Sequence, residues 1–134
     1  MAYRLSAVAQ TRFDERLILY GWLEDADFSR AMTKRGRLVE SQSIAGVHLG
    51  LKGGRVSGRK YGYSQVVNAW YLYGKNSISR KEAWRHTLQA LAANGVRQFR
   101  SEPYIDRRGR FAGNLIGLFH LAIGSSRPER AAEL

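Results

Sequence analysis

Residues 79–95 read SRKEAWRHTLQALAANG and form the clearest local signal in the chain. Ser79 followed by Glu82 is a capping box, in which both side chains satisfy free backbone N–H groups at a helix start. Gly95 predicts the end of this helix, because glycine readily takes the left-handed conformation that terminates helices. We therefore begin from a helix over residues 79–95.

This predicted helix has two unlike faces. Its apolar stripe should be buried and contains Trp84, Leu88, Leu91 and Gly95, with Ala83, Thr87 and Ala92 beside it. The opposite face contains Arg80, Lys81, Arg85, His86 and Gln89. Arginine pairs with guanine, glutamine pairs with adenine, and a helix N-terminus attracts phosphate, so this face is a candidate nucleic-acid contact. An ordinary solvated face is the alternative. The spacing places Trp84 in the core rather than at a base-stacking surface.

The segment after this helix predicts a β-hairpin. Residues 96–100 resemble a strand, residues 115–123 resemble a closing strand, and Gly109 can supply the positive φ of a turn between them. The tip, residues 106–110, reads DRRGR. Its three arginines exceed what a polar turn needs, so we interpret them as contacts to phosphates or a minor groove. They are Arg107, Arg108 and Arg110.

A second helix is predicted upstream. Ser64 can cap it, and Gly74 ends it. Its buried residues should be Val66, Val67, Trp70 and either Tyr71 or Leu72. A turn over residues 75–77 then connects the two helices.

The N-terminal half is less regular. Residues 13–28 fit a helix starting at Asp14 or a buried strand, and we favour the helix. The acidic Glu24, Asp25 and Asp27 near its end argue against it, because the helix dipole disfavours negative charge there. A short helix over 29–35 follows. Residues 50–62 hold five glycines and predict a flexible basic loop, which either follows a nucleic-acid backbone or is simply solvated. Its cations are Lys52, Arg55, Arg59 and Lys60.

The order helix, turn, helix, strand and hairpin over residues 63–123 resembles the winged helix-turn-helix superfamily. Residues 79–96 are similar to its recognition helix and first strand, and residues 105–111 look like the wing of some plasmid and phage replication or regulatory proteins. The resemblance implies a mostly α fold with a small β-hairpin. It also implies binding of duplex DNA, in transcriptional regulation or in plasmid or phage replication and maintenance.

The remaining parts complete a single domain. Residues 1–62 are expected to form an N-terminal helical extension with the basic glycine-rich loop, and residues 124–134 a disordered tail.

Charge supports a polyanionic partner. The chain has 22 Lys+Arg against 11 Asp+Glu, a net charge of +11 and a pI near 10.6. Residues 1–28 are net negative, so we expect them to face away from the polyanion or to serve a partner protein, a homodimer being one form of this.

Two rival functions stay open. Aromatic rings among basic residues suit RNA or single-stranded nucleic acid through base stacking. These rings are Tyr61, Tyr63, Trp70, Tyr71 and Tyr73. The other rival is a basic interaction protein that binds an acidic partner or blocks a ribonucleoprotein.

Other chemistries are disfavoured. The chain has no cysteine, and His48, His86 and His120 lie far apart without carboxylates at ligand spacing, so neither a metal nor a cofactor is expected. The acidic residues are too few and scattered for a nuclease centre, so we expect no enzyme. No apolar run approaches the ~20 residues of a membrane span, and no signal peptide is recognisable. A cytoplasmic protein without a membrane partner is therefore expected.

Overall fold

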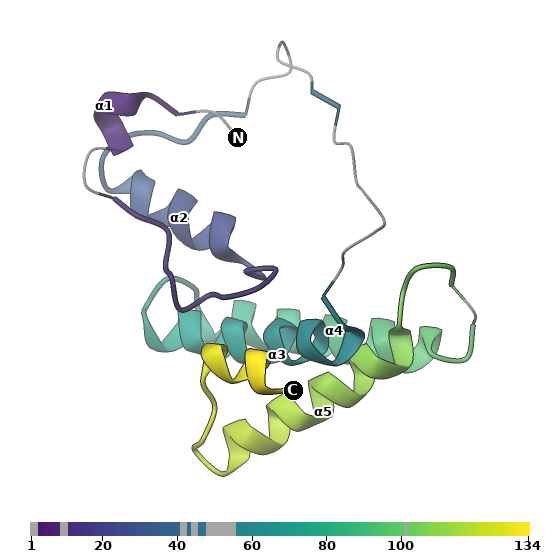
Figure 1. Ribbon diagram of the computed structural model, residues 1–134. Helices are drawn as coiled ribbons and strands as arrows, with labels where there is room; N and C mark the ends of the chain where they lie inside the picture. The colour runs from purple at the N-terminus through teal and green to yellow at the C-terminus, as the bar shows by residue number, and fades with distance from the viewer. Residues whose placement is uncertain (1–2, 9–10, 41–42, 44–45, 48–55, 101) are drawn as a thin grey trace.

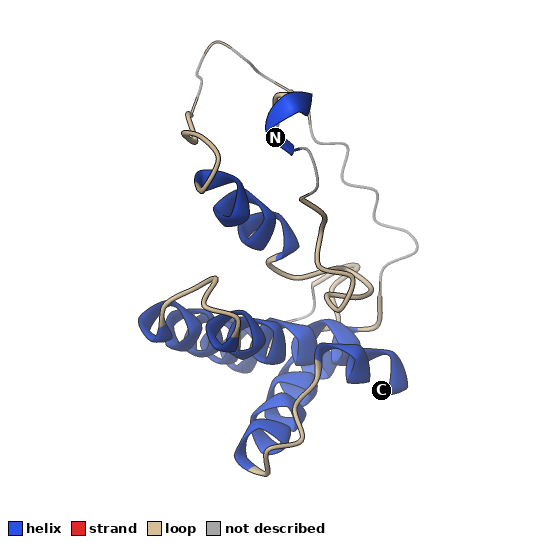
Figure 2. Cartoon of the chain, turned by 90° about the vertical axis from the view of Figure 1, so that its left-hand side faces the viewer, coloured by secondary structure: helices blue, strands red, loops and turns tan. Residues whose placement is uncertain are grey.

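The computed structural model describes residues 3–8, 11–40, 43, 46–47, 56–100 and 102–134, and it is helical throughout its ordered core (Figure 1). Its helices are α1 (Leu5–Val8), α2 (Glu24–Thr33), α3 (Gly58–Gly74), α4 (Arg80–Arg97), α5 (Arg107–Ala122) and the 3-10 helix η1 (Pro128–Glu133). The helices α3, α4 and α5 pack together, while α1 stands away from them in both Figure 1 and Figure 2.

The predicted β-hairpin is wrong. No residue that the structure describes lies in a β-strand, so the mostly α part of the expectation agrees with the structure and the winged architecture does not. Asp106 caps α5 by accepting a hydrogen bond of 2.7 Å from the backbone N–H of Gly109. An Asp with Gly three residues later suits a helix cap as well as a turn. Gly109 is therefore helical and does not have a positive φ.

Glycines bring α3 and α5 into close contact. Gly62 on α3 lies against the backbone of Arg110, and on α5 Gly113 and Gly117 lie against residues of α3, Gly113 against the backbone of Arg59 and Gly117 against Val66. A methyl group at Gly62 would lie 2.7 Å from the Cα and carbonyl carbon of α5 residue Arg110, and closer still to its oxygen. Small residues at this spacing let two helix backbones approach each other directly, as they also do between membrane helices.

The buried face of α4 differs from the predicted one. Its buried residues are Ala83, Thr87, Ala90 and Asn94, a stripe one position away from the expected apolar stripe. Trp84 is 43% exposed and Leu88 is 57% exposed, while Leu91 is half-buried. On the side of α3, Ala83 packs in one cluster with Ala69 and Leu72, whereas the large side chains of Trp84 and Leu88 are exposed. Gly95 does not end the helix, because α4 continues to Arg97 and Gly95 leaves room for the ring of Phe111.

A buried amide network joins the three helices. The Nδ2 group of Asn94 donates hydrogen bonds of 2.9 Å to Gln65 Oε1 on α3 and to Asn114 Oδ1 on α5. Asn114 in turn donates a 2.7 Å hydrogen bond to the carbonyl oxygen of Gly62. Buried amides are costly unless paired, so this network favours one arrangement of α4 on the α3–α5 pair.

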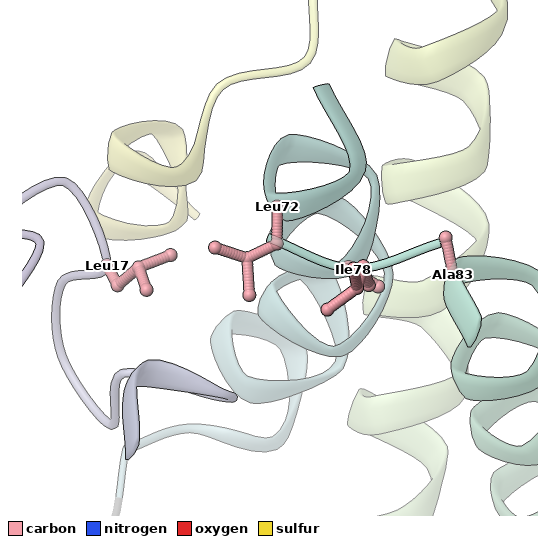
Figure 3. Packing of buried hydrophobic residues seen from close by; sticks show 5 residues of the cluster. Leu17, Leu72, Ile78 and Ala83 are labelled. Carbon is pink, nitrogen blue, oxygen red and sulfur yellow. The ribbon is translucent and has the colours of Figure 1, made fainter. Parts of the chain in front are cut away.

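Residues 13–28 do not form the single helix that we favoured. Turns occupy most of residues 15–23, with Leu19 and Leu23 at positive φ, and α2 begins only at Glu24. The acidic group therefore lies in the first turn of a helix, where the dipole favours it. Leu17 packs into a cluster of buried apolar side chains (Figure 3). The cluster also contains Ala69, Leu72, Ile78 and Ala83.

Ion pairs attach this N-terminal segment to the turn between α3 and α4. The Nζ atom of Lys75 lies 2.7 Å from carboxylate oxygens of both Asp14 and Asp27. Arg30 pairs with Glu82 at the start of α4 and donates a 2.6 Å hydrogen bond to the carbonyl oxygen of Ser77. Contacts of Asp14, Leu17, Asp27 and Arg30 thus attach the part of the N-terminal extension between residues 14 and 30 to the helical core.

The prediction that residues 124–134 form a disordered tail is also wrong. Residues 124–134 turn back and form η1, in which Pro128 and Ala131 are buried. Ala131 packs on Tyr63 and Val67 of α3, and Arg16 forms an ion pair with Glu129. A short polar segment is ordered here because its few apolar atoms fit a gap beside α3.

Candidate nucleic-acid interface

The outer face of α4 carries the clearest candidate site. Arg80, Lys81, Arg85 and Gln89 are exposed, as expected from the sequence. None of the three cations forms an ion pair within the described residues. His86 is half-buried, and its pKa is lowered by that burial and by the nearby charge of Arg85. The histidine therefore adds little positive charge to this face at neutral pH.

The N-terminus of α4 is already complemented by the protein. The Glu82 carboxylate accepts a 2.8 Å hydrogen bond from the backbone N–H of Ser79, whose Oγ accepts one from the Glu82 backbone, as the capping box predicted. The hydrogen bond from Arg30, supported by those from Ser79, lowers the pKa of Glu82 to about 2. Its negative charge opposes a phosphate at the helix end, so the side chains of the outer face must supply any anion binding.

More than half of the acidic residues form ion pairs within the protein. Asp14, Asp27, Glu82, Glu102, Glu129 and Glu133, six of the chain's 11 acidic residues, each pair with a cation. The positive excess is therefore carried by other side chains, including those of α4.

The three arginines predicted at a hairpin tip lie instead in the first turn of α5. Arg107 is largely buried, 2.8 Å from Glu102, and donates to Asn94 Oδ1 at 3.3 Å, so it supports the helix junction. The guanidinium of Arg110 lies 4.1 Å from the ring centroid of Tyr61, as in a cation–π contact. Arg108 is exposed. The arginines are not a basic tip, because the segment that was expected to turn is helical.

The other predicted cations are dispersed. Arg59 is exposed in the first turn of α3, whereas the Nζ group of Lys60 donates a 2.7 Å hydrogen bond to the carbonyl oxygen of Ala132. Lys52 and Arg55 lie outside the described residues. The predicted α4 residues therefore share one helix face. The predicted residues of α3 and α5 lie on other helices, and Lys60 and Arg107 form contacts within the protein.

An aromatic cluster beside the basic face joins Trp70 and Tyr73, two rings named from the sequence, to Trp84, which the sequence had placed in the core. The Trp70 ring lies 5.0 Å from Trp84 and 5.8 Å from Tyr73, nearly perpendicular to both. The Trp70 indole N–H donates a 3.1 Å hydrogen bond to Thr87 Oγ1, which fixes its orientation. Trp84 and Tyr73 are partly exposed. The sequence signal that could have revealed the exposure of Trp84 is the stripe of small residues on α4. If this stripe is taken as the buried face, Trp84 lies at its border.

Metal-ligand clusters and helices able to span a membrane are both absent from the described part of the chain. No group of three or more potential metal-ligating side chains occurs there. None of the described helices is long and apolar enough to cross a membrane.

Comparison of the chain with family models, curated proteins and solved structures finds no match. The resemblance to the winged helix-turn-helix superfamily therefore stays a prediction from the sequence, and the function has to be argued from the site itself.

Proposed function

We propose that this protein binds nucleic acid through the outer face of α4. The observation that carries the proposal is the group of exposed cations on this face, Arg80, Lys81 and Arg85, which have no acidic partner in the described residues. Such cations gain binding free energy from phosphates by releasing condensed counterions. The net charge of +11 gives the whole molecule the same preference.

The arrangement differs from an ordinary solvated helix face. Glu82 stands three residues before Arg85, a spacing at which helix ion pairs commonly form. Its carboxylate is instead held by Arg30 and Ser79, which leaves Arg85 unpaired. The same contacts that attach α2 to α4 therefore leave the basic side chains available to a partner.

Duplex DNA was the expected target because a recognition helix was combined with a wing. The described residues supply the helix without the wing, so the support that remains is for phosphate binding by α4. Transcriptional regulation and plasmid or phage replication are the processes in which we propose that such a protein acts.

The test is a salt series on a charge-neutralised variant. Lys81→Ala combined with Arg85→Ala should weaken binding to DNA and RNA oligonucleotides. It should also lower the slope of log affinity against log salt by ~0.9 for each duplex phosphate that the variant no longer neutralises. Arg127→Ala is the matched control, because Arg127 is also exposed and without an ion pair in the described residues but precedes η1. Equal affinities and slopes for the double variant and the parent would reject the proposal.

A second candidate function is binding of a protein partner. Leu115 and Phe119 on α5 and Ile123 at its C-cap repeat every four residues, and each is about half exposed or more. A row of exposed apolar side chains on one helix face is typical of a protein interaction surface. Substitution of Phe119 by Ser should then abolish capture of that partner while leaving oligonucleotide binding intact.

A further inference from the structure

Building on the proposed function, we propose that the strand held by α4 is unpaired and that one of its bases stacks on the ring of Trp84. The shared chemistry is a single strand of DNA or RNA with exposed base faces. The proposal rests on three features of the described residues: the exposure of Trp84, the orientation of its ring contact and the charges beside it.

The ring of Trp84 is accessible. Trp84 is 43% exposed, although tryptophan is usually highly buried. Its only ring neighbour among the described residues is Trp70, at a centroid distance of 5.0 Å and an interplanar angle of 89°. Two perpendicular rings meet edge to face, so at least one face of the Trp84 ring is not covered by Trp70.

The ring of Trp70, which contacts the ring of Trp84, is itself held in place. Trp70 is fixed by its hydrogen bond to Thr87 and by its perpendicular contact with Tyr73, which is 39% exposed. A pre-oriented aromatic surface loses little conformational entropy when a base stacks on it. The cluster therefore resembles a platform more than a loose surface side chain.

Basic side chains flank the ring. Arg80 and Lys81 stand four and three residues before Trp84, positions that are its neighbours on a helix surface. Single-strand binding proteins combine stacked bases with cations that follow the backbone, and this segment of α4 supplies both. The same charges argue against an uncharged or basic protein as the occupant of this ring.

The strand must be unpaired for this contact. In a duplex, each base is covered by its neighbours above and below, so a protein ring can stack on it only after the base is unstacked. In a single strand that cost is small, and every base offers a face. If the ligand were a duplex, the exposed ring of Trp84 would lie beside the sugar–phosphate backbone of the duplex and would have no base to stack on.

The test compares parent and variants on four probes of equal length. The probes are oligothymidylate, oligouridylate, a DNA duplex and an abasic DNA strand that keeps its phosphates but has no bases. Trp84→Ala should weaken binding to oligothymidylate and oligouridylate by roughly 5- to 100-fold. Binding to the duplex and the abasic strand should stay the same. Trp84→Phe should retain much of the affinity, and Phe119→Ala, another exposed ring, should change nothing.

The outcomes separate the two proposals. If Trp84→Ala binds the strands as the parent does, or weakens all four probes equally, the stacking inference is wrong while phosphate binding stands. If no probe binds, the proposed function fails first. Far-UV circular dichroism measures whether Trp84→Ala is folded. If Trp84→Ala is unfolded, Trp84→Phe is compared with the parent instead. Loss of all affinity of Trp84→Phe for both single strands would then overturn the stacking inference. A preference for oligouridylate over oligothymidylate assigns the strand as RNA, and the reverse as DNA.

Discussion

Replacing Gly62 by alanine sets two effects of opposite sign against each other. Inside a helix, alanine is favoured over glycine by about 1 kcal/mol, so α3 alone would be stabilised. In the folded protein, the new methyl group would lie 2.7 Å from the Arg110 Cα and carbonyl carbon and closer still to the carbonyl oxygen, well inside the 3.4 Å at which ordinary contacts begin. Helix α5 must therefore move away, because its backbone cannot rotate aside as a flexible side chain can.

The clash should prevail. Overpacking of this kind costs about 1–3 kcal/mol. Separation of the helices also strains the 2.7 Å hydrogen bond from Asn114 to the Gly62 carbonyl, a further contribution of about 1 kcal/mol. After subtraction of the gain in helix propensity, we expect Gly62→Ala to lower the free energy of unfolding by about 1–3 kcal/mol.

The assay is thermal unfolding followed by far-UV circular dichroism, with two other glycines for comparison. For a chain of this length the melting temperature should fall by roughly 3–5 °C per kcal/mol. Gly117→Ala should have a smaller effect, because its methyl group would lie 3.2 Å from Val66 Cβ. Gly74→Ala meets nothing within 4 Å and should be neutral or stabilising. A Gly62→Ala protein that melts at or above the parent temperature would refute the close packing of α3 on α5.

Two further predictions concern the α4 phase and the acid response. Leu72 is fully buried, so Leu72→Ala should lower the free energy of unfolding by about 2–5 kcal/mol. Leu91 is half-buried, so Leu91→Ala should lower it clearly less. Equal destabilisation of the two variants in denaturant unfolding would show that the helix phase is wrong. The pKa of Glu82 is lowered to about 2 from an ordinary 4.5, so its charge stabilises the fold fully above pH 4.5 and loses this effect as the pH falls towards 2. Glu82→Gln keeps the capping box but not the charge, so the stability difference between parent and variant should shrink over that pH range, and a difference independent of pH would contradict the ion pair with Arg30.

Local signals in the sequence predicted the start of α4 and the end of α3. They did not predict the start of α3, whose N-cap is Ser57 and not the expected Ser64. Ser79 and Glu82 form the predicted capping box, and Gly74 ends α3 where expected. Arg80, Lys81 and Arg85 of the α4 face are also exposed as predicted, because charged side chains stay in water in almost any fold. The net charge, and with it the expectation of a polyanionic partner, follows from composition alone.

Long-range packing decided the rest. Asp106 with Gly109 suits a turn or a helix cap, and the contact of α5 with α3 through glycines favours the helix. Likewise, α4 has an apolar stripe of large residues and a stripe of small ones. The helical period cannot tell which stripe is buried, because that depends on how the neighbouring helices pack. In the fold the small stripe faces inward, and Trp84 is left at the surface beside the basic face.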